Sequence, residues 1–87
     1  MTEPTLTVAM LQPDPPRTVD EALSVGLDSC RRARAGGADI VLFPELWNTG
    51  YRFPDREEDL PAWRDKALDP DSPFVRAFRE AARELSL

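Results

Sequence analysis

The chain has 87 residues, of which 41% are hydrophobic and 31% charged, so we expect one small globular domain at most. Its net charge of −5 disfavours nucleic acid and anionic membranes as partners, and the sequence lacks both a membrane-length apolar run and a signal peptide. With one cysteine and no histidine, we expect no disulfide, no ordinary zinc site and a reducing, cytoplasmic location.

Two short apolar segments predict the strands of a parallel sheet. Residues 5–12, TLTVAMLQ, and residues 40–43, IVLF, are apolar on both faces, which is typical of strands covered on both sides. A proline ends each segment, because proline has no N–H to give to a sheet. These are Pro13 and Pro44. We therefore expect a sheet that is buried on both faces.

A capping box marks the start of a helix between the two strands. Thr18 is placed to cap the first free N–H groups, and Glu21 follows three residues later. Gly26 on the apolar face indicates close packing against the sheet, and Gly36 and Gly37 predict a left-handed end. Strand, helix and strand together predict a βαβ unit with a right-handed crossover. The other members of the apolar face are Val19, Leu23, Leu27, Cys30 and Ala33 or Arg34.

The remainder of the chain predicts an irregular segment and one more long helix. Residues 50–61 are polar, and residues 61–68 favour a short helix with Trp63 and Ala67 on its inner side. Ser72 and Pro73 then predict the N-cap and first position of an amphipathic helix. That helix and two strands form an incomplete layer, so we expect residues 1–87 to be the amino-terminal part of a larger α/β domain. Its expected apolar stripe is Phe74, Phe78, Ala81, Ala82 and Leu85.

Glu45 is the strongest candidate for a chemical role. It follows the second strand at its carboxyl end, which is where open α/β sheets bind ligands. A carboxylate among apolar groups has a raised pKa and suits a general base. The simpler interpretation is an acidic residue that caps a backbone group or faces water. The neighbours expected to provide the apolar setting are Phe43, Pro44, Leu46, Trp47 and Tyr51.

Other reactive residues favour structural roles. Cys30 lies on the apolar helix face, which is typical of a small core residue, and the chain has no histidine to activate it. Lys66, the single lysine, is expected at a solvated helix position. Trp47 and Trp63 are expected to pack. The charged run 56–59 is expected to be solvated, and the chain has no phosphate-binding glycine motif.

The segment 37–51, GADIVLFPELWNTGY, resembles the nitrilase superfamily, the carbon–nitrogen hydrolases. Its GAD, apolar strand, FPE and TGY match that family in order and spacing, and so does the earlier VAMLQ strand. The resemblance extends from about residue 6 to residue 87 and is weakest over 52–71. It implies that the chain is the βαβα portion of a four-layer α-β-β-α sandwich. It also implies a cofactor-free, homo-oligomeric enzyme that hydrolyses a nitrile, amide or carbamoyl substrate.

The resemblance also implies roles for individual residues. Members of the family use a Glu, a Lys and a Cys, and Glu45 matches the Glu, the general base that acts on the cysteine thiol. Tyr51 is implied to help line the substrate pocket. The family's lysine and cysteine lie on strands beyond residue 87, so Cys30 and Lys66 do not fill those roles. The chain alone is therefore expected to be inactive.

Two alternatives to a hydrolase remain open at the level of sequence. The first is a free-standing small α/β module that binds a partner without catalysis, which the coding sequence after Leu87 would distinguish from a hydrolase. The second is the start of a flavodoxin-like or Rossmann-like nucleotide-binding fold. The second lacks the phosphate-binding glycines after Gln12, where residues 13–16 read PDPP.

Overall fold

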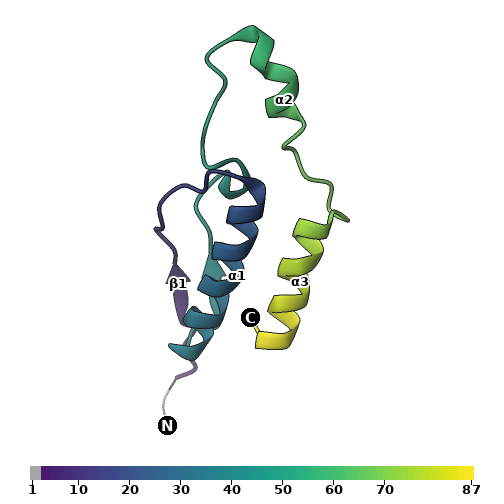
Figure 1. Cartoon of the computed structure of the whole chain (residues 1–87). Coiled ribbons are helices and arrows are strands. Elements are labelled where there is room, and N and C mark those ends of the chain that lie inside the picture. The colour runs from purple at the N-terminus through teal and green to yellow at the C-terminus, as the bar shows by residue number, and fades with distance from the viewer. Residues whose placement is uncertain (1–2) are drawn as a thin grey trace.

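The structure is a computed structural model and describes residues 3–87. Figure 1 shows α1 beside the strands, α3 next to α1, and α2 at the far end of a long excursion of the chain. The predicted strand–helix–strand order and the final helix are confirmed, although both strands are shorter than expected. In chain order the elements are β1 Val8–Met10, α1 Val19–Ala35, β2 Ile40–Leu42, the 3-10 turns Trp47–Thr49 and Glu57–Asp59, α2 Leu60–Arg64 and α3 Pro73–Leu85.

The two strands are parallel, as the sequence predicts, and Ala9 lies opposite Val41. Backbone hydrogen bonds extend the pairing beyond the strands, since the Asp39 N–H donates to the Thr7 carbonyl at 2.8 Å. The Thr7 N–H in turn donates to the Asp39 carboxylate at 2.9 Å. Arg34 at the end of α1 donates to the Ala38 carbonyl at 3.0 Å. These contacts fix the register of β2 against β1 and against the end of α1.

The sheet is covered on one face only, so the prediction of a sheet buried on both faces is wrong for residues 3–87. Side chains alternate between the two faces of a strand, and Ala9 and Val41 are half-buried on the covered face. On the other face, Met10 is 70% exposed and Leu42 is 54% exposed. In the described part of the chain no second layer covers this apolar face.

Helix α1 begins and ends as predicted, and at Gly26 it packs against α3 in addition to the predicted sheet side. The Glu21 N–H donates to Thr18 Oγ1 at 3.0 Å, and Gly37 after the helix has φ +96°. A Cβ at Gly26 would lie 2.5 Å from the Phe78 ring of α3 and 3.1 Å from Phe43. Gly26 therefore permits a helix–helix contact as well as contact with the end of β2. The buried face is Ala22, Gly26 and Cys30, of which Ala22 was absent from the predicted face.

Residues 52–71, which we call the arm, extend away from the helices and strands (Figure 1). The helix predicted over 61–68 is confirmed as α2, but it ends at Arg64. Ala67 lies after that end and is exposed, so its predicted inner position is wrong, whereas Trp63 is half-buried. The molecule measures 60 × 23 × 19 Å with a radius of gyration of 15.2 Å. A compact chain of this length would have a radius of about 12 Å, so the fold is elongated.

Helix α3 begins as predicted and packs its apolar stripe against α1. The Val75 N–H donates to the Ser72 side chain, and Pro73 occupies the first helical position. Phe78 packs edge-on against Phe43, with ring centroids 5.2 Å apart. The stripe is half-buried rather than buried, because one helix and two strands do not enclose it.

Candidate active site

Glu45 lies just past β2, where the two loops that leave the carboxyl ends of both strands meet. It lines a small pocket of about 40 Å³ together with Pro13 and Pro16 from the loop after β1 and Tyr51 from its own loop. A pocket of this size holds about one or two water molecules. The pocket thus marks a junction of loops beside Glu45 and does not by itself accommodate an organic substrate.

The Glu45 side chain is exposed, although four of its five expected apolar neighbours line the small pocket beside it, namely Pro44, Leu46, Trp47 and Tyr51. These neighbours therefore lie beside the carboxylate without burying it. Phe43 points toward α3, and Trp47 is buried against α1, while Leu46 is itself 39% exposed. The hydrogen bonds of residues 3–87 include none to the Glu45 side chain. Its position is therefore set by the backbone of its loop.

Residues 44–51, which we call the site loop, contain three left-handed residues. They are Leu46 at φ 55°, Gly50 at φ 68° and Tyr51 at φ 58°. The Leu46 carbonyl accepts hydrogen bonds from the N–H groups of Thr49 and Tyr51 at 3.1 and 3.3 Å. A Cβ at Gly50 would overlap the Pro16 carbonyl oxygen, so only glycine fits there. Strained backbone of this kind occurs preferentially at functional sites.

Trp47 joins the site loop to the body of the molecule. Its side chain is 8% exposed, and its indole N–H donates to the Ala22 carbonyl of α1 at 2.9 Å. Its ring lies 5.8 Å from that of Phe43. The prediction that Trp47 is a packing residue is confirmed.

Tyr51 lies close to Glu45. Both residues line the same small pocket, and the Tyr51 side chain is 55% exposed. Its ring packs edge-on against Phe53 at 5.3 Å. The site loop therefore presents one carboxylate and one phenol at the same end of the sheet.

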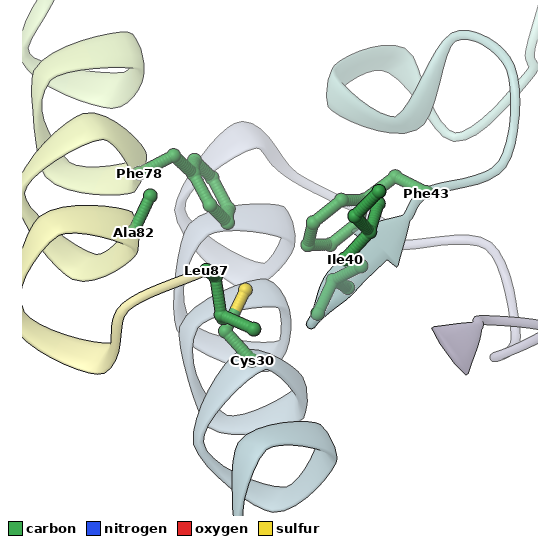
Figure 2. Close-up of a pocket in the computed structure, with 7 residues that line it drawn as sticks. Cys30, Ile40, Phe43, Phe78, Ala82 and Leu87 are labelled. Atoms are coloured by element: carbon green, nitrogen blue, oxygen red, sulfur yellow. The ribbon is translucent and has the colours of Figure 1, made fainter. Parts of the chain in front are cut away.

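Cys30 and Lys66 lie away from Glu45. Figure 2 shows Cys30 in an apolar cavity of about 250 Å³ between α1, β2 and α3, which Phe78, Ala82 and Leu87 also line. Burial raises the pKa of the Cys30 thiol, and the nearby Arg31 charge only partly opposes this. The interpretation of Cys30 as a core residue is confirmed. Lys66 is half-buried just after α2, rather than at a solvated helix position, and its carbonyl accepts a hydrogen bond from Asn48 at 2.8 Å.

Two residues of the site region were not singled out by sequence. Asn48 joins the site loop to the arm through Lys66, and Asp39 bonds to the start of β1. For Asp39 a signal was present, because it is a polar residue at the entry to an apolar strand. For Asn48 no local pattern distinguishes this contact from an ordinary turn residue.

Residues 3–87 contain no group of three or more His, Cys, Asp or Glu side chains that could hold a metal ion. Within the same residues, no helix has the length and apolar character needed to cross a membrane.

Comparison with known proteins relates the chain to one enzyme family. The family model described as carbon–nitrogen hydrolase matches residues 7–87. The chain is 39% identical over 59 residues to a cyanide hydratase of Botryotinia fuckeliana (strain T4), covering 60% of this chain and 16% of that protein. It is 38% identical over 60 residues to a bromoxynil-specific nitrilase of Klebsiella pneumoniae subsp. ozaenae, covering 61% of this chain and 17% of that protein.

No solved structure matches the chain. The match to each of the two relatives spans about a sixth of that relative's length. The family model, in contrast, covers the chain from β1 through α3. The chain therefore belongs to the carbon–nitrogen hydrolase family.

Proposed function

We propose that this chain supplies Glu45 as the general base of an enzyme that hydrolyses a carbon–nitrogen bond. The observation that carries the proposal is the position of Glu45. It is an exposed carboxylate on a strained loop, directly after β2, where the loops from both strand ends meet. Ligands of open α/β sheets bind at this end of the strands. Family membership then assigns the class of reaction.

The proposed chemistry needs two groups that this chain does not provide. Glu45 takes the proton of a cysteine thiol, and the thiolate attacks the substrate carbon. With an amide or carbamoyl substrate the C–N bond breaks, the nitrogen leaves as ammonia or an amine carrying that proton, and the acyl group stays on sulfur as a thioester. A nitrile first gives a thioimidate, which adds water and loses ammonia to reach the same thioester. Water then cleaves the thioester to the acid and restores the thiol. A lysine stabilises the negative charge on the reacting atom. We assign both groups to residues outside 1–87, because Cys30 is enclosed in the core and Lys66 is held at the arm.

The proposed enzyme is built as a four-layer α-β-β-α sandwich, of which residues 1–87 form an amino-terminal part. The uncovered sheet face supports this, since Met10 and Leu42 are large apolar side chains that require a second layer. The complete protein is proposed to assemble into homo-oligomers and to work without a cofactor.

Nitriles, amides and carbamoyl compounds are the proposed substrate classes, and Tyr51 is proposed to line their pocket. Two relatives are named as a cyanide hydratase and a nitrilase. Their names favour a carbon–nitrogen triple bond among these classes. Tyr51 shares the small pocket with Glu45, so its phenol is placed to contact a substrate that reaches the carboxylate.

Replacing the base tests the proposal. In the complete protein that contains this chain, Glu45→Gln is expected to reduce kcat at least about 100-fold, because the amide cannot accept the thiol proton. Glu80→Gln is the matched control, since Glu80 is exposed on α3, away from the site loop. Turnover of a nitrile is followed by product formation, and thermal unfolding is measured in parallel. Near-normal turnover by Glu45→Gln would remove Glu45 from the mechanism.

A polypeptide of residues 1–87 alone is expected to have no turnover, because it carries one of the three catalytic groups. The measurement is product formation from nitrile, amide and carbamoyl substrates at high protein concentration. Turnover that persists in the Glu45→Gln form of this polypeptide would indicate a different catalyst. Binding of a protein partner without turnover by the complete protein would favour the non-catalytic module instead.

A further inference from the structure

We propose that Trp47 is the positioning residue for Glu45, through the hydrogen bond from its indole N–H to the Ala22 carbonyl. The inference rests on the proposed function, since it concerns the placement of the base. Trp47 also lines the small pocket beside Glu45, but its indole N–H is directed to α1. It acts by holding the loop that carries Glu45.

The site loop needs an external attachment because its backbone is strained. Left-handed backbone is unfavourable for a residue with a side chain, and Leu46 and Tyr51 both adopt it. The hydrogen bonds from Thr49 and Tyr51 to the Leu46 carbonyl close the loop on itself. Such internal bonds preserve the shape of the loop, but they do not fix its position relative to α1 and β2.

Trp47 provides that attachment. In the site loop only Trp47 and Gly50 are buried, and Gly50 has no side chain with which to bind. The Trp47 indole donates to the carbonyl of Ala22, which is fully buried on α1. An indole N–H that is buried without an acceptor is costly, and the Ala22 carbonyl supplies that acceptor, so the contact has one strongly favoured geometry.

Glu45 depends on this attachment because its own side chain has none. Its carboxylate lacks a hydrogen-bond partner among residues 3–87, so its location follows the backbone two residues before Trp47. A general base must lie within hydrogen-bond reach of the proton it removes. A small displacement of the site loop would move the carboxylate out of that reach.

Trp47→Phe removes the donor and retains an aromatic ring. Trp63→Phe is a matched control, because the Trp63 indole also donates to a backbone carbonyl, that of Arg52 at 2.8 Å, but within the arm. In the complete protein we expect Trp47→Phe to lower kcat about 10- to 100-fold, as expected for a misplaced catalytic group, with KM little changed. Trp63→Phe should leave kcat within about twofold, since the arm contact does not hold Glu45.

Hydrogen–deuterium exchange provides a readout that does not depend on activity. Peptides covering residues 44–51 should exchange faster in Trp47→Phe, and those covering 52–71 should exchange faster in Trp63→Phe. If Trp47→Phe accelerates exchange throughout α1 and β2, the variant is unfolded. In that case kcat and exchange are measured on a protein in which benzothienylalanine replaces Trp47. In this residue sulfur takes the place of the indole N–H and the ring system is kept, so only the hydrogen bond is lost.

Unchanged kcat in the Trp47 variants, or a lower kcat without faster exchange in the site loop, overturns the positioning role. The two proposals fail separately. Normal turnover by Glu45→Gln refutes the proposed base, whatever the Trp47 variants do. An inactive Glu45→Gln protein beside a fully active Trp47→Phe protein refutes only the positioning role.

Discussion

At the scale of single residues, the GAD and FPE parts of the segment 37–51 have different tasks. Asp39 accepts the Thr7 N–H and fixes the entry to β2, and Ala38 is 3% exposed beneath it. Glu45 at the other end of β2 is exposed and without a partner among residues 3–87. One short strand thus separates a residue used for structure from a residue proposed for chemistry.

Cys30 should react slowly with thiol reagents, because burial raises its pKa and encloses the sulfur. A raised pKa leaves less thiolate at any pH below it, and the thiolate is the reacting form. At pH 8, iodoacetamide should label Cys30 at least about tenfold more slowly in the folded protein than in urea. Mass spectrometry of the peptide that contains Cys30 measures the rate. Equal rates in the two states would contradict the core assignment.

The same pKa shift predicts how Cys30 affects stability. Folding favours the protonated thiol, so this contribution to stability is complete below the ordinary pKa of cysteine. It is lost as the pH rises through the raised pKa of the folded state. Between the ordinary pKa and the raised pKa, the thiol is ionised in the unfolded state but not in the folded state. This difference lowers the free energy of unfolding as the pH rises.

At the scale of elements, the contact between α1 and α3 depends on Gly26. Adding a methyl group there would normally favour the helix by about 1 kcal/mol. The methyl would instead collide with the Phe78 ring, which is held in place by Phe43 and Phe74 with centroids 5.2 and 5.0 Å away. The added atom therefore forces the ring to shift toward the cavity beside Cys30 or the two helices to move apart, and either change disturbs this aromatic contact.

Gly26→Ala is therefore expected to lower the free energy of unfolding by about 1–3 kcal/mol, the usual cost of overpacking. Gly36→Ala is the control, because Gly36 has φ −82° and a Cβ there would make ordinary contacts at 3.5 Å. It should leave stability unchanged or slightly higher. Urea unfolding followed by circular dichroism measures both variants. Equal stability of Gly26→Ala and the parent protein would contradict the packing described for α1 and α3.

The elements that the sequence predicted best are those with local signals. Thr18, Gly37, Ser72 and Pro73 act on backbone within one turn of themselves, so their patterns could be interpreted without knowledge of the fold. The burial of Ala22 was not predicted, because it depends on Trp47, 25 residues further along the chain. The end of α2 was also mispredicted, since an isolated helix of five residues has little intrinsic stability and its length is set by its surroundings.

At the scale of the whole molecule, the main feature is a sheet that has one uncovered apolar face and only a small core behind the other. The buried hydrophobic residues are only Ala22, Cys30, Ala38 and Trp47 in the described chain. The elongated shape and the exposed strand side chains agree with this small core. Apolar strands indicated that both faces require cover, but a strand pattern does not identify the segment that provides it.

The position of Glu45 was predictable from the strand pattern. Parallel strands place their carboxyl ends at one edge, and a proline follows each strand shortly after that edge. The surroundings of Glu45 were predictable only in part, because Trp47 and Tyr51 line its pocket whereas Phe43 turns toward Phe78 of α3. Sequence neighbours of a residue in a loop need not be its neighbours in space.

The central claim is that Glu45 activates a cysteine located outside residues 1–87. Intact-mass spectrometry of the complete protein, quenched shortly after mixing with a nitrile, tests it most directly. We predict a covalent adduct in the parent protein and in Cys30→Ala, and none in Glu45→Gln. An adduct that forms normally in Glu45→Gln, or one that maps to Cys30, would contradict the account.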